Sequence, residues 1–186
     1  FDELEQVNRA NLETWRPLNP TFLPENGLLD EESAFVLLGS DVSGRVLTAT
    51  ALKVFDWHGT DFRQEAESLR LLFADPVSMA PPGAACRITA PAAATLGGRI
   101  GYAGAGWLHP SVRKRRIGAV LSRILRGWAY ARWGVETVCA ISSLGLIGKG
   151  YTEQNGYRHT EEGVRFVNLD ACPPEAGLVW ITDEEL

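Results

Sequence analysis

The chain has 186 residues, of which 45% are hydrophobic and 22% are charged, so it is long enough for one domain, residues 1–186, with a sizeable core. Its formal net charge of −5 argues against a general nucleic-acid-binding protein. No apolar run approaches the length of a membrane span and no signal peptide is visible, so we expect a cytoplasmic protein that does not bind membranes.

The three cysteines, Cys86, Cys139 and Cys172, lie far apart in the sequence and form no C-x-x-C motif. They therefore indicate neither a metal cluster nor a disulfide framework, and they suit a reducing compartment. We expect Cys139 to be a small core residue rather than a nucleophile.

The N-terminal part begins with a predicted helix over residues 1–15, where apolar residues recur between acids and amides. Three prolines predict a loop over residues 16–27. We expect Trp15 and Phe22 to pack in the core.

A hairpin is predicted next. Residues 34–39 are a strand by composition, residues 40–44 a turn, and residues 45–57 a longer strand. A helix over residues 61–74 should follow, with Thr60 or Asp61 as its N-cap.

That helix carries Glu65 and Glu67, which could take part in acid–base chemistry only if it bordered an acceptor cleft; otherwise they are solvated surface acids. Residues 75–98 are rich in proline, alanine and glycine and predict a long connection with one short strand near residues 86–89.

The central stretch, residues 101–134, predicts a strand, a basic turn and a long helix. The strand covers residues 102–108 and ends before Pro110. The helix shows an apolar stripe with three- and four-residue steps and ends at Gly134. The stripe consists of Ile117, Leu121, Ile124 and Trp128.

The turn between that strand and that helix has the chemistry of an anion-binding site. The first turn of a helix has unpaired N–H groups and a positive dipole end, and it favours phosphate. Residues 113–116 add four cations, and Gly118 allows a ligand to approach the backbone. The alternative is a solvated basic patch that only precedes a helix.

The last part predicts a strand over residues 135–141 and a short, glycine-interrupted helix over residues 145–154. Extended segments follow at residues 157–159, 164–169 and 177–182.

The residues Leu108 to Gly118, LHPSVRKRRIG, resemble the pyrophosphate-binding signature of the GNAT superfamily, the acyl-CoA-dependent N-acyltransferases. The signature runs Q/R-x-x-G-x-G/A at the start of a long helix. Arg113 matches its first position and Gly118 its last, whereas Arg116 stands where the family usually has its first glycine. The segment YTEQNGY, residues 151–157, also resembles the F-Y-E-K-x-G-F end of the family's last helix.

The resemblance covers roughly residues 34–169. It implies an α/β fold with a mixed, mostly antiparallel sheet, flanking helices and a splayed pair formed by the fourth and fifth strands. The first family strand is not evident, and the helical, Pro- and Ala-rich segment 60–98 is an unusual insert.

The resemblance also implies a site for acetyl-CoA between the splayed strands, with no metal. Backbone groups near Trp107 and Leu108 would pair with the pantetheine arm, and the N–H groups of residues 114–119 would hold the pyrophosphate. The implied binding residues are Trp107, Leu108, Arg113, Lys114, Arg115, Arg116, Ile117, Gly118 and Ala119.

Direct transfer of the acetyl group to a primary amine would need a base and an acid. The family often uses a tyrosine of the last helix as the acid; Thr152 occupies that position and Tyr151 precedes it, so Tyr151 is the candidate acid or else a packing residue. Residues 102–108 contain no carboxylate, so His109 is the candidate base or else a turn histidine. A base acting through water, or no dedicated base, is also open.

The expected acceptor is a small-molecule or peptide amine. Two alternatives to acetyl transfer stay open: a longer-chain N-acyltransferase of the N-acyl amino acid synthase type, and a catalytically degenerate CoA-binding module. The resemblance also implies a possible homodimer, because dimerisation through the last strands is common in the family.

Overall fold

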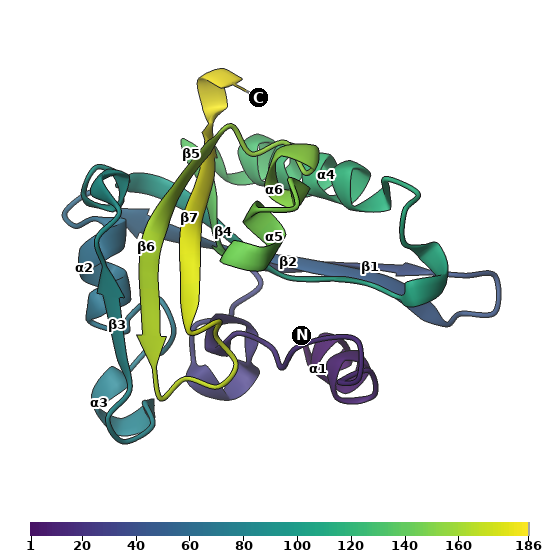
Figure 1. Cartoon of the computed structure of the whole chain (residues 1–186), viewed down its shortest axis with the longest axis horizontal. Coiled ribbons are helices and arrows are strands. Elements are labelled where there is room, and N and C mark those ends of the chain that lie inside the picture. The colour runs from purple at the N-terminus through teal and green to yellow at the C-terminus, as the bar shows by residue number, and fades with distance from the viewer. Residues whose placement is uncertain (186) are drawn as a thin grey trace.

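One seven-stranded sheet organises the chain, and the computed structural model describes residues 1–185 (Figure 1). The strands in chain order are β1 (Ala34–Ser40), β2 (Val46–Trp57), β3 (Ala85–Ile88), β4 (Gly98–Leu108), β5 (Thr137–Ser143), β6 (His159–Val167) and β7 (Glu175–Thr182). Their order in the sheet is β1-β2-β4-β5-β7-β6-β3. Neighbouring strands are antiparallel except β4 and β5, which are parallel, so the mixed, mostly antiparallel sheet is confirmed.

The helices cover both faces of the sheet. They are α1 (Asp2–Arg9), α2 (Phe62–Glu67), α3 (Pro76–Met79), α4 (Ile117–Trp133), α5 (Leu144–Ile147) and α6 (Tyr151–Gln154). Leu125 of α4 packs in a cluster with Val138 of β5, whereas Leu4 of α1 and Phe62 of α2 belong to a larger cluster that contains Tyr102 of β4. The sheet therefore separates α4 from α1 and α2.

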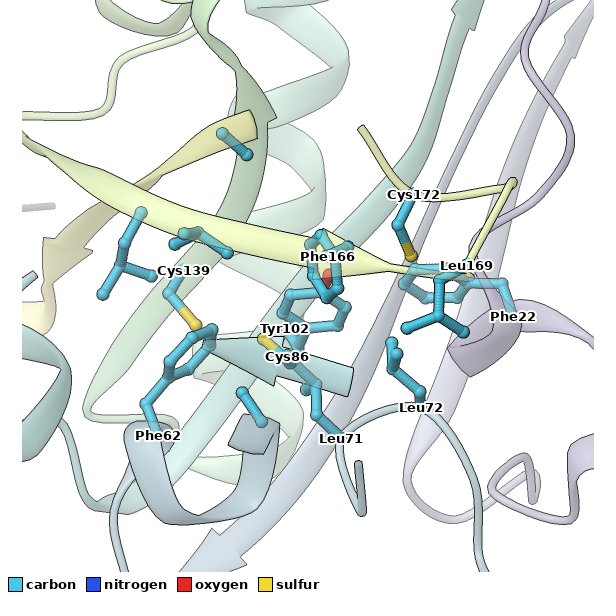
Figure 2. Packing of buried hydrophobic residues seen from close by; sticks show 14 of the residues in the cluster. Phe22, Phe62, Leu71, Leu72, Cys86, Tyr102, Cys139, Phe166, Leu169 and Cys172 are labelled. Atoms are coloured by element: carbon cyan, nitrogen blue, oxygen red, sulfur yellow. The ribbon is translucent and has the colours of Figure 1, made fainter. Parts of the chain in front are cut away.

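Tyr102 lies at the centre of the larger cluster in Figure 2, with three cysteine thiols around it. Cys86, Cys139 and Cys172 are all free and buried. Burial raises the pKa of the Cys86 and Cys172 thiols to about 12. Such thiols stay protonated and unreactive at neutral pH, as expected of core residues.

Strands β4 and β5 diverge after three residue pairs, of which Tyr102 opposite Cys139 is the last. Beyond that pair, β4 continues to Leu108 and β5 continues to Ser143. A bulge in β4 accompanies the divergence: Ala49 and Ala51 of β2 face Trp107 and Gly104, so two β4 residues lie opposite Thr50. Bulges bend a strand and increase its twist. The predicted splay of the fourth and fifth strands is confirmed.

The hairpin β1–β2 and the insert strand β3 lie where the sequence predicts them, but the helix after the hairpin is shorter than predicted. Its N-cap is Asp61, whose side chain accepts a hydrogen bond from the Gln64 amide, and it ends at Glu67. Leu69 adopts a positive φ of 64°, which stops the helix, and the following Leu71 and Leu72 turn into the core. Likewise α1 ends at Arg9.

The apolar stripe predicted for α4 is wrong in its second half: Ile117 and Leu121 are half-buried, but the later two residues are exposed. Ile124 and Trp128 are 50% and 53% exposed, whereas Leu125, Arg126 and Ala129 are buried. The buried face of the helix is narrow and includes the small side chain of Ala129. Trp128 lies at the side of the helix, next to Phe35 of β1, with ring centroids 6.3 Å apart. Gly134 ends the helix with a φ of 59°, as predicted.

Of the three extended segments predicted after residue 156, the first two overlap one continuous strand, β6, with an irregularity between Glu162 and Val164, and the third lies in β7. The short strand β3 pairs with β6 and forms that edge of the sheet. Within residues 1–185, no helix has the length and apolar character that crossing a membrane requires.

Candidate functional site

The gap between β4 and β5 begins where their pairing ends. From Ala103 to Leu108, β4 pairs with β2 on one side and, within residues 1–185, has no strand partner on the side of β5. The side chains from Ala103 to Gly106 are small: Phe22 packs against Gly104 from one face of the sheet, and a Cβ at Gly106 would meet no atom within 4 Å. A free strand edge of this kind can pair with an extended, amide-containing ligand.

The side chain of Trp107 points away from solvent into the core. Its ring stacks on that of Trp15, with centroids 5.0 Å apart and an interplanar angle of 7°, and its Nε1 donates to Thr14 Oγ1 at 3.3 Å. Only the backbone of Trp107 is therefore left for a ligand, in line with the role predicted for it.

Arg113 fastens the basic turn to the end of β4. Its Nε donates to the Leu108 carbonyl at 2.9 Å and its Nη2 donates to the Thr14 carbonyl at 3.2 Å. The guanidinium is thus engaged with two protein carbonyls. In the part of the chain that the structure describes, Lys114, Arg115 and Arg116 are exposed and their side chains form no hydrogen bond or ion pair.

The backbone of the basic turn has the shape that glycine favours. Arg116 adopts a left-handed conformation with φ 57° and ψ 17°, and Lys114 has a φ of 65°. Turns that contain left-handed residues direct successive N–H groups into an anion-binding concavity. Arg116 therefore adopts a conformation that glycine tolerates better, at a conformational cost of about 1–2 kcal/mol.

The first turn of α4 follows directly, and no side chain caps it. Its leading N–H groups, at Ile117, Gly118 and Ala119, have no acceptor within the helix. A Cβ at Gly118 would lie 3.1 Å from Asn155 Oδ1 and 3.8 Å from Leu108 Cδ1. Glycine therefore brings the helix start close to both the end of β4 and the residue after α6. The structure brings all nine predicted acetyl-CoA-binding residues together along one path from β4 into α4.

The two predicted catalytic residues lie on opposite sides of the gap. His109 follows β4: its Nε2 lies 2.8 Å from Arg45 Nη2, and its Nδ1 lies 2.7 Å from Ser111 Oγ. Both ring nitrogens are thus engaged, so His109 has no free nitrogen for a substrate proton in this arrangement. Tyr151 follows β5, begins α6 and is 48% exposed, whereas Thr152 is buried.

Glu65 and Glu67 lie away from the gap between β4 and β5, and Glu67 lines a second cavity of about 400 Å³ with Cys86 and Arg87 of β3. Arg70 donates to both carboxylate oxygens of Glu65, at 2.9 and 2.8 Å, and these bonds lower the pKa of that carboxyl. Glu67 accepts from the Ile88 amide at 2.9 Å. Both carboxylates accept hydrogen bonds from nearby segments of the chain. Glu65 is buried, which contradicts the prediction of a solvated surface acid.

A cavity of about 630 Å³ lies at the end of β5. It is lined by the N-terminal segment, the start of α5 and the β6–β7 connection, which lie beside one another in Figure 1. Its charged lining residues are Arg16, Arg165 and Glu175. Sequence reasoning missed these three residues, because they come from separate segments and form no motif.

No protein-family model matches the sequence, and no curated protein matches it. Among solved structures, the aminoglycoside acetyltransferase AAC(6')-Ib in complex with coenzyme A and kanamycin is 14% identical, with a TM-score of 0.53 over 99% of this chain and 89% of that chain. Arabidopsis thaliana NAA60 in complex with acetyl-CoA is 12% identical, with a TM-score of 0.54 over 98% of this chain and 93% of that chain. The same enzyme with a bisubstrate analogue is 12% identical, with a TM-score of 0.53 over 97% and 91% of the two chains. The splayed β4–β5 pair and this similarity over nearly the whole chain identify its fold as that of the GNAT acetyltransferases.

Proposed function

We propose that the chain is an N-acetyltransferase that moves the acetyl group of acetyl-CoA directly to a primary amine. One observation carries the proposal: the free edge of β4 leads without interruption into the basic turn and the uncapped start of α4. An amide-bearing arm and a pyrophosphate are joined in the same order in acetyl-CoA. The neighbours of similar fold that were solved with coenzyme A or acetyl-CoA support this choice of donor.

In this proposal the pantetheine arm lies along Ala103–Leu108 of β4, where backbone groups lack a partner on the β5 side. The pyrophosphate lies at the N–H groups of residues 114–119, and the exposed side chains of Lys114, Arg115 and Arg116 supply countercharge. Arg113 acts indirectly by holding the turn against the Leu108 carbonyl.

The reaction is an acyl transfer between sulfur and nitrogen. The lone pair of a neutral amine attacks the thioester carbonyl carbon, a C–N bond forms and the C–S bond breaks. The amine loses one proton and the departing thiolate gains one, so the products are an N-acetyl amide and coenzyme A with a free thiol. The candidate acid for the thiolate is Tyr151. His109 would have to leave Arg45 or Ser111 before it could act as the base, which favours a base acting through water.

The three buried, free thiols are consistent with a reducing compartment, so we place the reaction in the cytoplasm. Dimerisation through the last strands stays a prediction. Because β3 covers β6, an edge-to-edge contact at this end of the sheet would involve β3.

Calorimetric titration with acetyl-CoA, desulfo-CoA and a long-chain acyl-CoA tests the proposal, followed by an assay of CoA release with a panel of amines. We expect micromolar binding of acetyl-CoA, about −8 kcal/mol, and amine-dependent release of CoA. Tighter binding and faster transfer of the long chain would favour the longer-chain N-acyltransferase. Binding without transfer to any amine would leave a CoA-binding module, and absence of binding would end the proposal.

A further inference from the structure

The charged residues of the cavity at the end of β5 have no partners of their own. Within residues 1–185, the side chains of Arg16, Arg165 and Glu175 take part in no hydrogen bond or ion pair. Cations that line a cavity without a protein partner are suited to an anionic ligand group, and an arginine can hold a carboxylate through two parallel hydrogen bonds.

Arg16 is held in place by the chain around it. Its carbonyl accepts a hydrogen bond from Asn8 Nδ2 at 2.9 Å, and its neighbour Trp15 is buried against Trp107. Its guanidinium lies close enough to Cys172 to oppose the effect of burial on the pKa of that thiol. This places the Arg16 side chain beside the β6–β7 connection, where Asn19 Nδ2 also lies 3.8 Å from Cys172 Sγ.

Arg165 and Glu175 lie directly opposite each other on β6 and β7, so their side chains share one face of the sheet. No ion pair joins them, and both line the cavity. With Arg16, the lining carries two positive charges and one negative charge. This pattern complements a molecule that has a carboxylate and an ammonium group.

The cavity lies at the end of β5, the strand that borders the gap, and its lining within residues 1–185 includes no residue of β4. Ser143, the last residue of β5, lines it together with Leu144 and Gly145 at the start of α5. Because β5 borders the gap, an acceptor held in the cavity would approach the gap from the side of β5. A volume of about 630 Å³ lies within the range of small-molecule sites.

We infer that the acceptor is an amino acid, whose carboxylate binds Arg16 and Arg165 and whose ammonium group is attracted by Glu175 before it loses its proton. The inference rests on the proposed function and specifies the acceptor. The side chains of Arg16, Arg165 and Glu175 are exposed, and the primary amide of an amino acid lacks the negative charge with which the two arginines would pair.

The test compares each protein amino acid with its primary amide as the acceptor, with acetyl-CoA as the donor. We expect at least one amino acid to have a kcat/KM at least about tenfold above that of its amide, which corresponds to roughly 1.4 kcal/mol. The amide has the less basic amine and so the larger neutral fraction, which biases the comparison against this result. The variants Arg16→Gln and Arg165→Gln should each lose most of the preference.

Arg87→Gln is the matched control, because Arg87 lies opposite Arg165 on β3 but does not line the cavity. The preference should survive in this variant. Amides acetylated as well as amino acids, a preference that survives both cavity variants, or no acetylated amino acid despite acetyl-CoA binding would each overturn the inference. Acetyl-CoA binding is measured first on the same preparations, so a failure of the proposed function is recognised before any acceptor is added.

Discussion

Arg126 of α4 donates a hydrogen bond from Nη1 to the carbonyl of Asn155, the residue after α6, at 2.7 Å. The guanidinium is buried and lies over the Tyr157 ring, 5.8 Å from its centroid. Gly156 has a φ of 87°, and a Cβ there would lie 2.6 Å from Arg126 Nη2. This contact ties the helix that carries the proposed pyrophosphate site to the segment that carries Tyr151.

Removal of that contact should destabilise the protein. We expect Arg126→Ala to lower the free energy of unfolding by about 2–3 kcal/mol, because the Asn155 carbonyl loses a charged donor and the packing of a buried side chain is lost. Arg123→Ala, an exposed position one turn earlier on α4, should change it by less than about 0.5 kcal/mol. Denaturant unfolding monitored by circular dichroism measures both, and equal effects would contradict the structural role given to Arg126.

Glycine at position 116 should give a free energy of unfolding at least as high as that of the parent protein with Arg116. Its left-handed φ of 57° costs about 1–2 kcal/mol for a residue with a side chain, which exceeds the extra unfolded-state entropy of glycine. We therefore expect Arg116→Gly to be neutral or stabilising by up to about 1 kcal/mol. Arg115→Gly is the control, since Arg115 is not among the positive-φ residues, and it should be destabilising. Chemical denaturation measures the free energy of unfolding of both variants. An equal loss of stability in Arg116→Gly and Arg115→Gly would refute the assignment of backbone strain to Arg116.

A large side chain at the start of α4 should block the proposed donor site. We expect Gly118→Trp to fold but to lose calorimetric binding of acetyl-CoA, because the backbone there must approach the pyrophosphate. Gly127→Trp on the same helix is the control for a tryptophan outside the site, since a Cβ at Gly127 meets no atom within 4 Å. Because a Cβ at Gly118 lies 3.1 Å from Asn155 Oδ1, circular dichroism is used to check that Gly118→Trp folds. Unchanged affinity in a folded Gly118→Trp protein would remove the placement of the site.

The Glu65–Arg70 pair should contribute to acid sensitivity. Hydrogen bonds from Arg70 hold the pKa of Glu65 below its ordinary value of 4.5, so the ionised carboxylate stabilises the folded state above that value. The contribution is lost as the pH falls through the lower pKa of the folded protein. Between about pH 5 and pH 3 the free energy of unfolding should fall less steeply in Glu65→Gln than in the parent protein. Glu162→Gln, an exposed position on β6, serves as the control; identical slopes for Glu65→Gln and the parent would rule out the contribution.

Local sequence was sufficient for the hairpin, for the second part of β4, which begins at Gly98 rather than at residue 102, and for the basic turn and long helix that follow it. The signals there are contiguous: apolar composition in the strands, Pro110 after β4, four cations in a row, and Gly134 at the helix end. The nine proposed acetyl-CoA-binding residues could be named for the same reason, since all lie within one short stretch, residues 107–119.

Only the tertiary structure decided which face of α4 is buried and which residues meet in the cavity. Arg126 turns inward because a carbonyl and an aromatic ring of another segment receive it, while Trp128 lies outward beside β1. Arg16, Arg165 and Glu175 become neighbours only when β6 and β7 pair and the N-terminal segment packs beside their connection. Periodicity and motif spacing describe neighbours along the chain, whereas contacts between distant segments depend on how those segments pack.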